Sequence, residues 1–179
     1  TPLSQLAEFT RAEAKAIADF ARARGVTVPI VSSQGMPTAF VDEYDPVRKM
    51  FRKILGKPTG TFTPHIRLGQ SSIPQAFHEI GHASPIAGSH DLRRVFQALG
   101  STIGGGSTFG HLLRGAIAMS GAVAPTEDSS AVHRFVADNA PALVGATLMP
   151  ELIDEARASI HAIRGAGKSG YGAMRAVKE

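Results

Sequence analysis

The sequence predicts a mostly helical α+β fold in a single domain over residues 1–179, and three observations carry that prediction. A chain of 179 residues with 43% hydrophobic content fits one domain with a sizeable core. Apolar residues recur at steps of three and four in several long segments, which indicates amphipathic helices. Two short apolar segments beside turn residues have the character of strands, and they predict a small sheet.

The N-terminal part, residues 1–97, is expected to hold that sheet and three of the helices. Residues 1–25 form an amphipathic helix that ends at Gly25. Pro29 limits the strand expected at 26–33 to an edge or an end of the sheet. The remaining expected elements are a helix over 45–56, a loop over 57–64, a strand over 65–69, and a helix over 71–84 capped by Ser71 or Ser72, with Pro74 in its first turn.

The C-terminal half is expected to be helical. Residues 98–149 are rich in Gly and Ala and predict a helical hairpin, whose second helix is interrupted near Pro141. Pro150 opens the last helix, followed by a basic tail, within residues 150–179. The apolar run from Leu112 to Ala124 is too short for a membrane span and contains Arg114, so a spanning helix is not favoured.

Composition excludes several kinds of site. The chain has no Cys, which removes disulfides, thiolate nucleophiles and Cys-based zinc sites. Any metal must therefore be held by His and carboxylates. The net charge is +4, and the basic segments at 48–53 and 164–178 lack interleaved aromatic residues. Specific recognition of nucleic acid is therefore not expected.

The segment "HEIGH", residues 78–82, carries the clearest chemical signal. Residues four apart share one face of a helix, so His78 and His82 can bind one ion. Glu79 can reach a water on that ion without being a ligand. Zinc lowers the pKa of such a water and a carboxylate takes its proton, so the pattern predicts a zinc-dependent hydrolase with Glu79 as the base. Two histidines of the core are the alternative.

A third ligand is needed, because a catalytic zinc usually takes three from the protein. Pro85 and Gly88 stand where a third-histidine motif would require glycine and histidine, which excludes that class. Glu155 is favoured because it shares an expected inward-facing stripe with residues such as Leu152 and Ser159, and a buried carboxylate needs a partner. Glu151 is the competitor, although its place after Pro150 is also explained by the helix dipole.

These two segments together resemble a known family. "HEIGHA" followed far downstream by "EARASIHA" is similar to the gluzincin metallopeptidases, and more narrowly to the bacterial membrane-associated neutral zinc metallopeptidases. The resemblance covers residues 64–100 and 145–165. It implies a zincin-like domain that binds Zn²⁺ through His78, His82 and Glu155, with Glu79 as the catalytic base. It also implies that Ser159 stands where many gluzincins have an aspartate beside the ligands.

The expected reaction is hydrolysis of a peptide or protein substrate. Candidates to stabilise the oxyanion are His111, His133, His161 and Tyr171, of which His161 is better explained as a surface or core histidine. The rival function is a non-catalytic structural or assembly protein that retains a zincin-like fold. A homo-oligomer, a larger assembly and a membrane surface remain open as partners. The settings left open are the cytoplasm or membrane of a bacterium and a phage-like particle.

Overall fold

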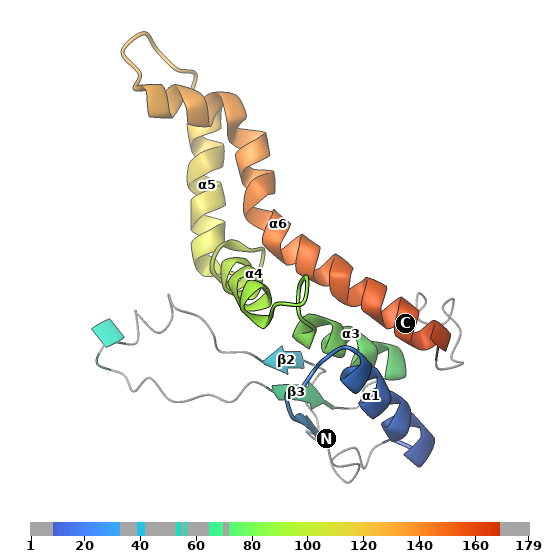
Figure 1. The fold of residues 1–179 in the computed structure, drawn as a ribbon. Helices are drawn as coiled ribbons and strands as arrows, with labels where there is room; N and C mark the ends of the chain where they lie inside the picture. The colour runs from blue at the N-terminus through green and yellow to red at the C-terminus, as the bar shows by residue number, and fades with distance from the viewer. Residues whose placement is uncertain are drawn as a thin grey trace. The chain divides into compact units, whose positions relative to one another are not determined.

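The computed structural model describes residues 9–32, 39–41, 53–54, 56, 65–69 and 72–168. The fold is α+β and mostly helical, as predicted (Figure 1). Its elements are α1 (Arg11–Ala23), β1 (Ile30–Ser32), β2 (Ala39–Val41), β3 (His65–Leu68), α3 (Ile73–Ala83), α4 (His90–Ile103), α5 (Thr108–Ala122) and α6 (Ala131–Lys168). Apart from Lys53, Ile54 and Gly56, the helix predicted over 45–56 lies outside the described residues.

The chain divides into two compact units. The first contains residues 1–44, 58–94 and 154–179, and the second contains residues 45–57 and 95–153. Helices α4 and α6 therefore each contribute to both units. The single domain over 1–179 stays a prediction.

The sheet of the first unit has three strands in the order β1-β3-β2. β1 pairs in parallel with β3, and β2 pairs antiparallel with β3. β1 begins at Ile30, directly after Pro29, and lies at an edge, as the proline predicted. β2 was not predicted, because three residues between turn-forming segments show too little alternation to be identified.

Local capping signals start α1 and α3. The helix predicted over residues 1–25 begins at Arg11 among the described residues, since Phe9 and Thr10 are not helical, whereas the start of α3 after Ser72 is as expected. Thr10 caps α1, and its backbone N–H donates to Glu13 at 2.8 Å in a capping box. Ser72 stands at the N-cap of α3, where its N–H donates to Gln75 at 3.0 Å. Pro74 lies in the first turn of α3, where its missing N–H costs nothing.

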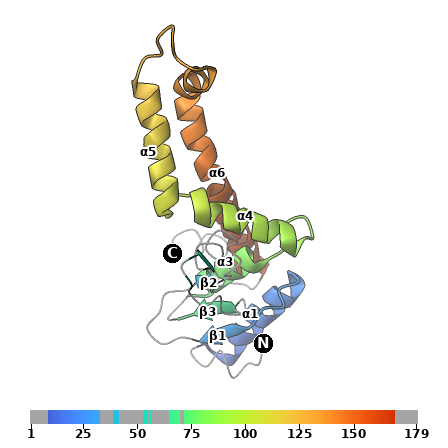
Figure 2. The ribbon, with the colours of Figure 1, turned by 90° about the vertical axis from the view of Figure 1, so that its left-hand side faces the viewer.

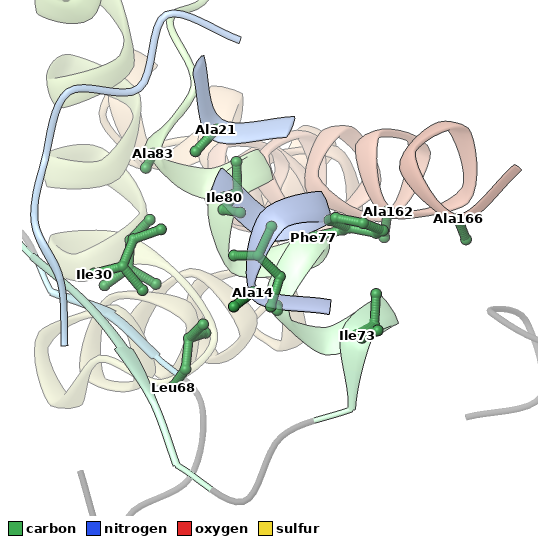
Figure 3. Close-up of a cluster of buried hydrophobic side chains, with 13 residues drawn as sticks. Ala14, Ala21, Ile30, Leu68, Ile73, Phe77, Ile80, Ala83, Ala162 and Ala166 are labelled. Carbon is green, nitrogen blue, oxygen red and sulfur yellow. The ribbon is translucent and has the colours of Figure 1, made fainter. Parts of the chain in front are cut away.

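The hydrophobic core lies among α1, the sheet, α3 and the last turns of α6 (Figure 3). Its fully buried members include Ile17, Ile30, Ile66, Leu68 and Ile80. Figure 3 shows Phe77 of α3 directed toward Ala162 and Ala166 of α6. α3 also contacts β2 and β3, so this helix is held by the sheet and by α6.

In the second unit, α5 runs beside the first part of α6, as Figure 1 and Figure 2 both show. A helical hairpin is therefore present where the Gly- and Ala-rich composition predicted one. Arg114 of α5 donates to the carbonyl oxygens of Ile103 and Gly104 at 2.7 Å and 3.2 Å. Its guanidinium also lies 3.5 Å from the hydroxyl of Thr147 on α6. None of the helices described is both long and apolar enough to cross a membrane.

Two predicted helix boundaries are wrong. α6 continues through Pro141 and Pro150, whereas the sequence predicted an interruption near the first and a new helix at the second. A proline inside a helix removes one hydrogen bond, and packing along the rest of α6 can outweigh that loss. At the start of α4, the hydroxyl of Ser89 accepts the N–H of Leu92 at 3.1 Å, and Asp91 lies in the first turn.

Candidate metal centre

His78 and His82 lie one turn apart on α3 and turn their rings toward each other. Their Nε2 atoms are 3.0 Å apart, and the ring centroids are 4.7 Å apart. Ile80 and Phe77 lie in the core, which fixes how α3 rotates about its axis. The local sequence therefore presents two imidazole nitrogens at one point beside α6.

Glu155 of α6 completes a cluster of three possible ligands. Its Oε2 lies 3.3 Å from Nε2 of His78, and its Oε1 lies 3.5 Å from Nε2 of His82. Ligand atoms of all three residues lie within 4.8 Å of one another. We call His78, His82 and Glu155 the candidate metal centre. The sequence predicted this set.

The spacing of these atoms fits a small tetrahedral cation. Bonds of about 2.0–2.1 Å at tetrahedral angles place ligand atoms roughly 3.3–3.4 Å apart. The two Nε2 atoms are 3.0 Å apart, and the distances to Glu155, 3.3 Å from His78 to Oε2 and 3.5 Å from His82 to Oε1, are close to that value but involve both carboxylate oxygens. Two imidazoles and one carboxylate make up the donor set of several catalytic metal sites that leave one position open.

Asp154 holds His82 in the orientation that a ligand needs. Nδ1 of His82 donates to Oδ2 of Asp154 at 2.8 Å. Because a carboxylate can only accept, Nδ1 carries a proton, and when the ring is neutral Nε2 keeps its lone pair toward the candidate metal centre. Metal-binding histidines usually donate their other N–H in this way, which fixes the tautomer.

Arg157 fixes Asp154 and the end of α3 together. Its guanidinium donates to Oδ1 of Asp154 at 2.8 Å and to the carbonyl oxygens of Ser84 and His82 at 2.9 Å and 3.3 Å. The carbonyl oxygens at a helix end lack partners within the helix, and a cation there is favourable. Arg157 thus joins α6 to the C-terminal end of α3, next to the candidate metal centre.

The pKa values of His82 and Asp154 are shifted in the directions expected for a hydrogen bond between a histidine N–H and a carboxylate. Burial alone lowers the pKa of His82, but the hydrogen bond and charge of Asp154, together with the charges of Glu155 and Glu79, outweigh burial and raise that pKa above its ordinary value. Burial alone raises the pKa of Asp154, but His82 and Arg157 outweigh it and leave that pKa below its ordinary value. Asp154 is therefore a carboxylate at neutral pH, as a hydrogen-bond acceptor for His82 must be.

Solvent reaches the candidate metal centre from the side of Glu155, whose side chain is 56% exposed, whereas His82 is largely buried. Glu79, the expected base, is half-buried on α3 beside His78. Its negative charge contributes to the raised pKa of His82, which places its carboxylate within electrostatic reach of that ring.

The other candidate residues are distributed differently. Glu151, the competitor of Glu155, accepts the backbone N–H of Gly105 in the α4–α5 loop and is not in the cluster. Ser159 is exposed on α6. His111 belongs to α5 and lies 3.4 Å from the guanidinium of Arg114. Tyr171 lies outside the described residues.

Two oxyanion candidates remain. His133 is half-buried in the first turn of α6, in the second unit. His161 lies in the first unit, where its Nδ1 is buried and has no hydrogen-bond partner among the described residues. In the part of the chain that the structure describes, neither residue belongs to the cluster of His78, His82 and Glu155.

The face of α6 that turns inward was predicted only in part. Of the expected stripe of Leu148, Leu152, Ser159 and Ala162, Leu152 and Ser159 are exposed, whereas Ala162 is buried. The buried residues of this part of α6 are Asp154, Ala158, Ala162, Gly165 and Ala166. Alanines four apart let α6 approach α3 closely, and this spacing was the signal that could have identified Asp154 as an inward-facing residue.

Compared with protein-family models, with curated proteins and with solved structures, the chain gives no match.

Proposed function

We propose that this chain is a zinc-dependent peptide hydrolase of a zincin-like type. The observation that carries the proposal is the candidate metal centre itself, with two imidazole nitrogens and a carboxylate at 3.0–3.5 Å from one another. Zinc suits this donor set, because it accepts nitrogen and carboxylate ligands in tetrahedral geometry and the chain offers no thiolate.

Each residue of the site has a distinct role in such a reaction. His78, His82 and Glu155 would hold the ion. A bound zinc supplies a water of lowered pKa and a Lewis acid for the substrate carbonyl. Glu79 accepts the proton of the attacking water and delivers it to the amine of the leaving peptide, which balances the proton transfer. Asp154 and Arg157 keep His82 in its binding tautomer throughout.

Two features favour catalysis over a purely structural metal. A structural zinc usually has four protein ligands, and the cluster found among the described residues has three. The exposure of Glu155 leaves the remaining position accessible to water and to a substrate. A non-catalytic assembly protein remains the rival function, and the apolar surface of the helical hairpin described below favours it.

The experiment that tests the proposal compares Glu79→Gln with the unsubstituted chain. Zinc content is measured by plasma mass spectrometry, and turnover is measured on a mixture of peptides. Glu127→Gln, at an exposed position of the second unit, is the matched control. We expect Glu79→Gln to keep one zinc per chain and to lose at least about 100-fold in turnover, because a positioned acid–base group contributes about that much or more. Turnover equal to that of Glu127→Gln would reject Glu79 as the base, and zinc without turnover in any variant would favour the assembly protein.

A further inference from the structure

Helix α5 exposes an apolar stripe that its own hairpin does not cover. Phe109, Leu112, Met119 and Val123 are 58%, 69%, 72% and 58% exposed, and Ala116 between them is exposed as well. These five residues, which we call the α5 stripe, follow one another at steps of three, four, three and four, and the last of them, Val123, is the C-cap of α5 with an extended backbone. That is the spacing of the contact positions of a coiled coil.

The opposite side of α5 is the side that packs within the hairpin. Arg114 reaches Thr147 of α6, and seven residues later a Cβ on Gly121 would lie 2.5 Å from Cβ of Ala140. In heptad terms, Arg114 and Gly121 hold the position farthest from the α5 stripe. The stripe therefore faces away from α6, the helix beside α5 in Figure 1.

We propose that the α5 stripe is a dimerisation surface whose partner is the α5 stripe of a second copy of this chain. The flanking positions of the heptad hold Thr108, Leu113, Gly115, Ser120 and Ala122. None of them is charged, so two identical stripes meet without repulsion. Glycine, serine and alanine at these places, with Ala116 in the middle of the stripe, let two helices approach closely.

The exposed area of the α5 stripe is large enough for two copies of the chain to form a dimer. At the stated exposures the four large side chains present on the order of 500 Å² of mostly apolar surface, more than a scattered set of surface residues does. Two copies would bury about 1,000 Å² in total, which is at the lower end of specific protein interfaces. A weak, reversible dimer is expected.

The charge of the hairpin favours this partner over a lipid surface. Residues 95–153 contain two arginines and four acidic residues, Glu127, Asp128, Asp138 and Glu151. Arg114 is already engaged with backbone carbonyls inside the unit. Helices that lie on membranes usually carry lysine and arginine along the polar face, and this hairpin does not.

The test measures the mass of the full chain in solution by sedimentation at about 100 μM, where a weak dimer is populated. We expect a dimer for the unsubstituted chain and a monomer for Leu112→Glu and for Met119→Glu, since a charge on the α5 stripe would be buried in the dimer interface without a partner. Ala118→Glu, exposed on the same helix but off the stripe, is the matched control and should remain dimeric. A monomeric unsubstituted chain, or equal loss of the dimer with Ala118→Glu, would overturn the proposal.

Cross-linking provides a second readout that does not depend on a disruptive charge. The chain has no cysteine, so a single introduced one reports only on its own surroundings. Ala116 is the middle residue of the stripe, so Ala116→Cys should form a disulfide-linked dimer on mild oxidation in either helix orientation, and Ala118→Cys should not. A chain that stays monomeric but sediments with neutral phosphatidylcholine vesicles would assign the stripe to a lipid surface and contradict the dimer.

Discussion

The backbone of Ala158 on α6 lies directly against Gly81 on α3. A Cβ added at Gly81 would stand 2.7 Å from Cα and 2.9 Å from the carbonyl oxygen of Ala158. No side chain fits there, because backbone atoms cannot yield as the end of a flexible side chain does. This contact brings α6 close enough for Glu155 to meet His78 and His82, so packing and chemistry depend on the same glycine.

Gly81→Ala is therefore expected to damage both stability and metal binding. The added methyl group should force α6 away from α3 and lower the free energy of unfolding by about 1–3 kcal/mol, as overpacking usually does. Zinc affinity should fall with it. Gly167→Ala is the control, since a Cβ there meets no atom within 4 Å, and its stability should be unchanged or slightly higher. Urea denaturation of both variants checks this, and equal stability would contradict the close contact.

Asp154→Asn should weaken metal binding without removing a ligand. An amide can still contact Nδ1 of His82, but it no longer selects the tautomer that leaves Nε2 free. Loss of such an orienting carboxylate typically costs 10- to 100-fold, roughly, in metal affinity. Competition with a chromophoric chelator measures the change, with Asp138→Asn at an exposed site of α6 as the control. Identical affinities in the two variants would show that Asp154 does not orient the ligand.

Glu151→Gln and Glu155→Gln test which of two glutamates is the third metal ligand, a choice that the sequence alone left open. Glu155→Gln should lose bound zinc, because a neutral amide is a poor ligand. Glu151→Gln should keep one zinc per chain and lose about 1–3 kcal/mol of stability, because the N–H of Gly105 loses a charged acceptor. Zinc content and thermal unfolding are measured for both variants. Loss of zinc in Glu151→Gln but not in Glu155→Gln would assign Glu151, in place of Glu155, as the third ligand.

The lowered pKa of His161 predicts that the free energy of unfolding depends on pH. Burial and the positive charges of Arg24, Arg157 and Arg164 lower its pKa to about 4. The unfolded chain, with a histidine pKa of about 6.5, binds more protons between these two values, so the free energy of unfolding should fall as pH decreases from about 6.5 toward 4. Above pH 6.5 His161 contributes no further change. In chelator-treated protein, His161→Gln should reduce this fall, measured by urea denaturation across that range. A His161 ring that titrates near pH 6.5 by NMR would contradict this.

The local parts of this molecule were predictable because their signals are short. The cap at Ser72, the proline of the first turn and the spacing of His78 and His82 all lie within one helix. Each of them follows from chemistry between near neighbours, and so the helix and two residues of the candidate metal centre were predicted.

The parts that depend on distant packing were not predictable in the same way. The inward face of α6 was predicted only in part, because large apolar residues such as Leu152 are exposed and small alanines are buried. That choice depends on how closely α3 can approach, which is set by Gly81 far away in the sequence. Asp154 was missed for the same reason.

The most direct test of the candidate metal centre is the X-ray absorption spectrum of the chain loaded with one equivalent of zinc. The proposed site predicts a shell of nitrogen and oxygen atoms at about 2.0–2.1 Å that includes two imidazoles, and loss of the bound metal in Glu155→Gln. Failure of the chain to retain one zinc after dialysis, or a zinc shell without imidazole, would contradict the assignment of His78, His82 and Glu155 as its ligands.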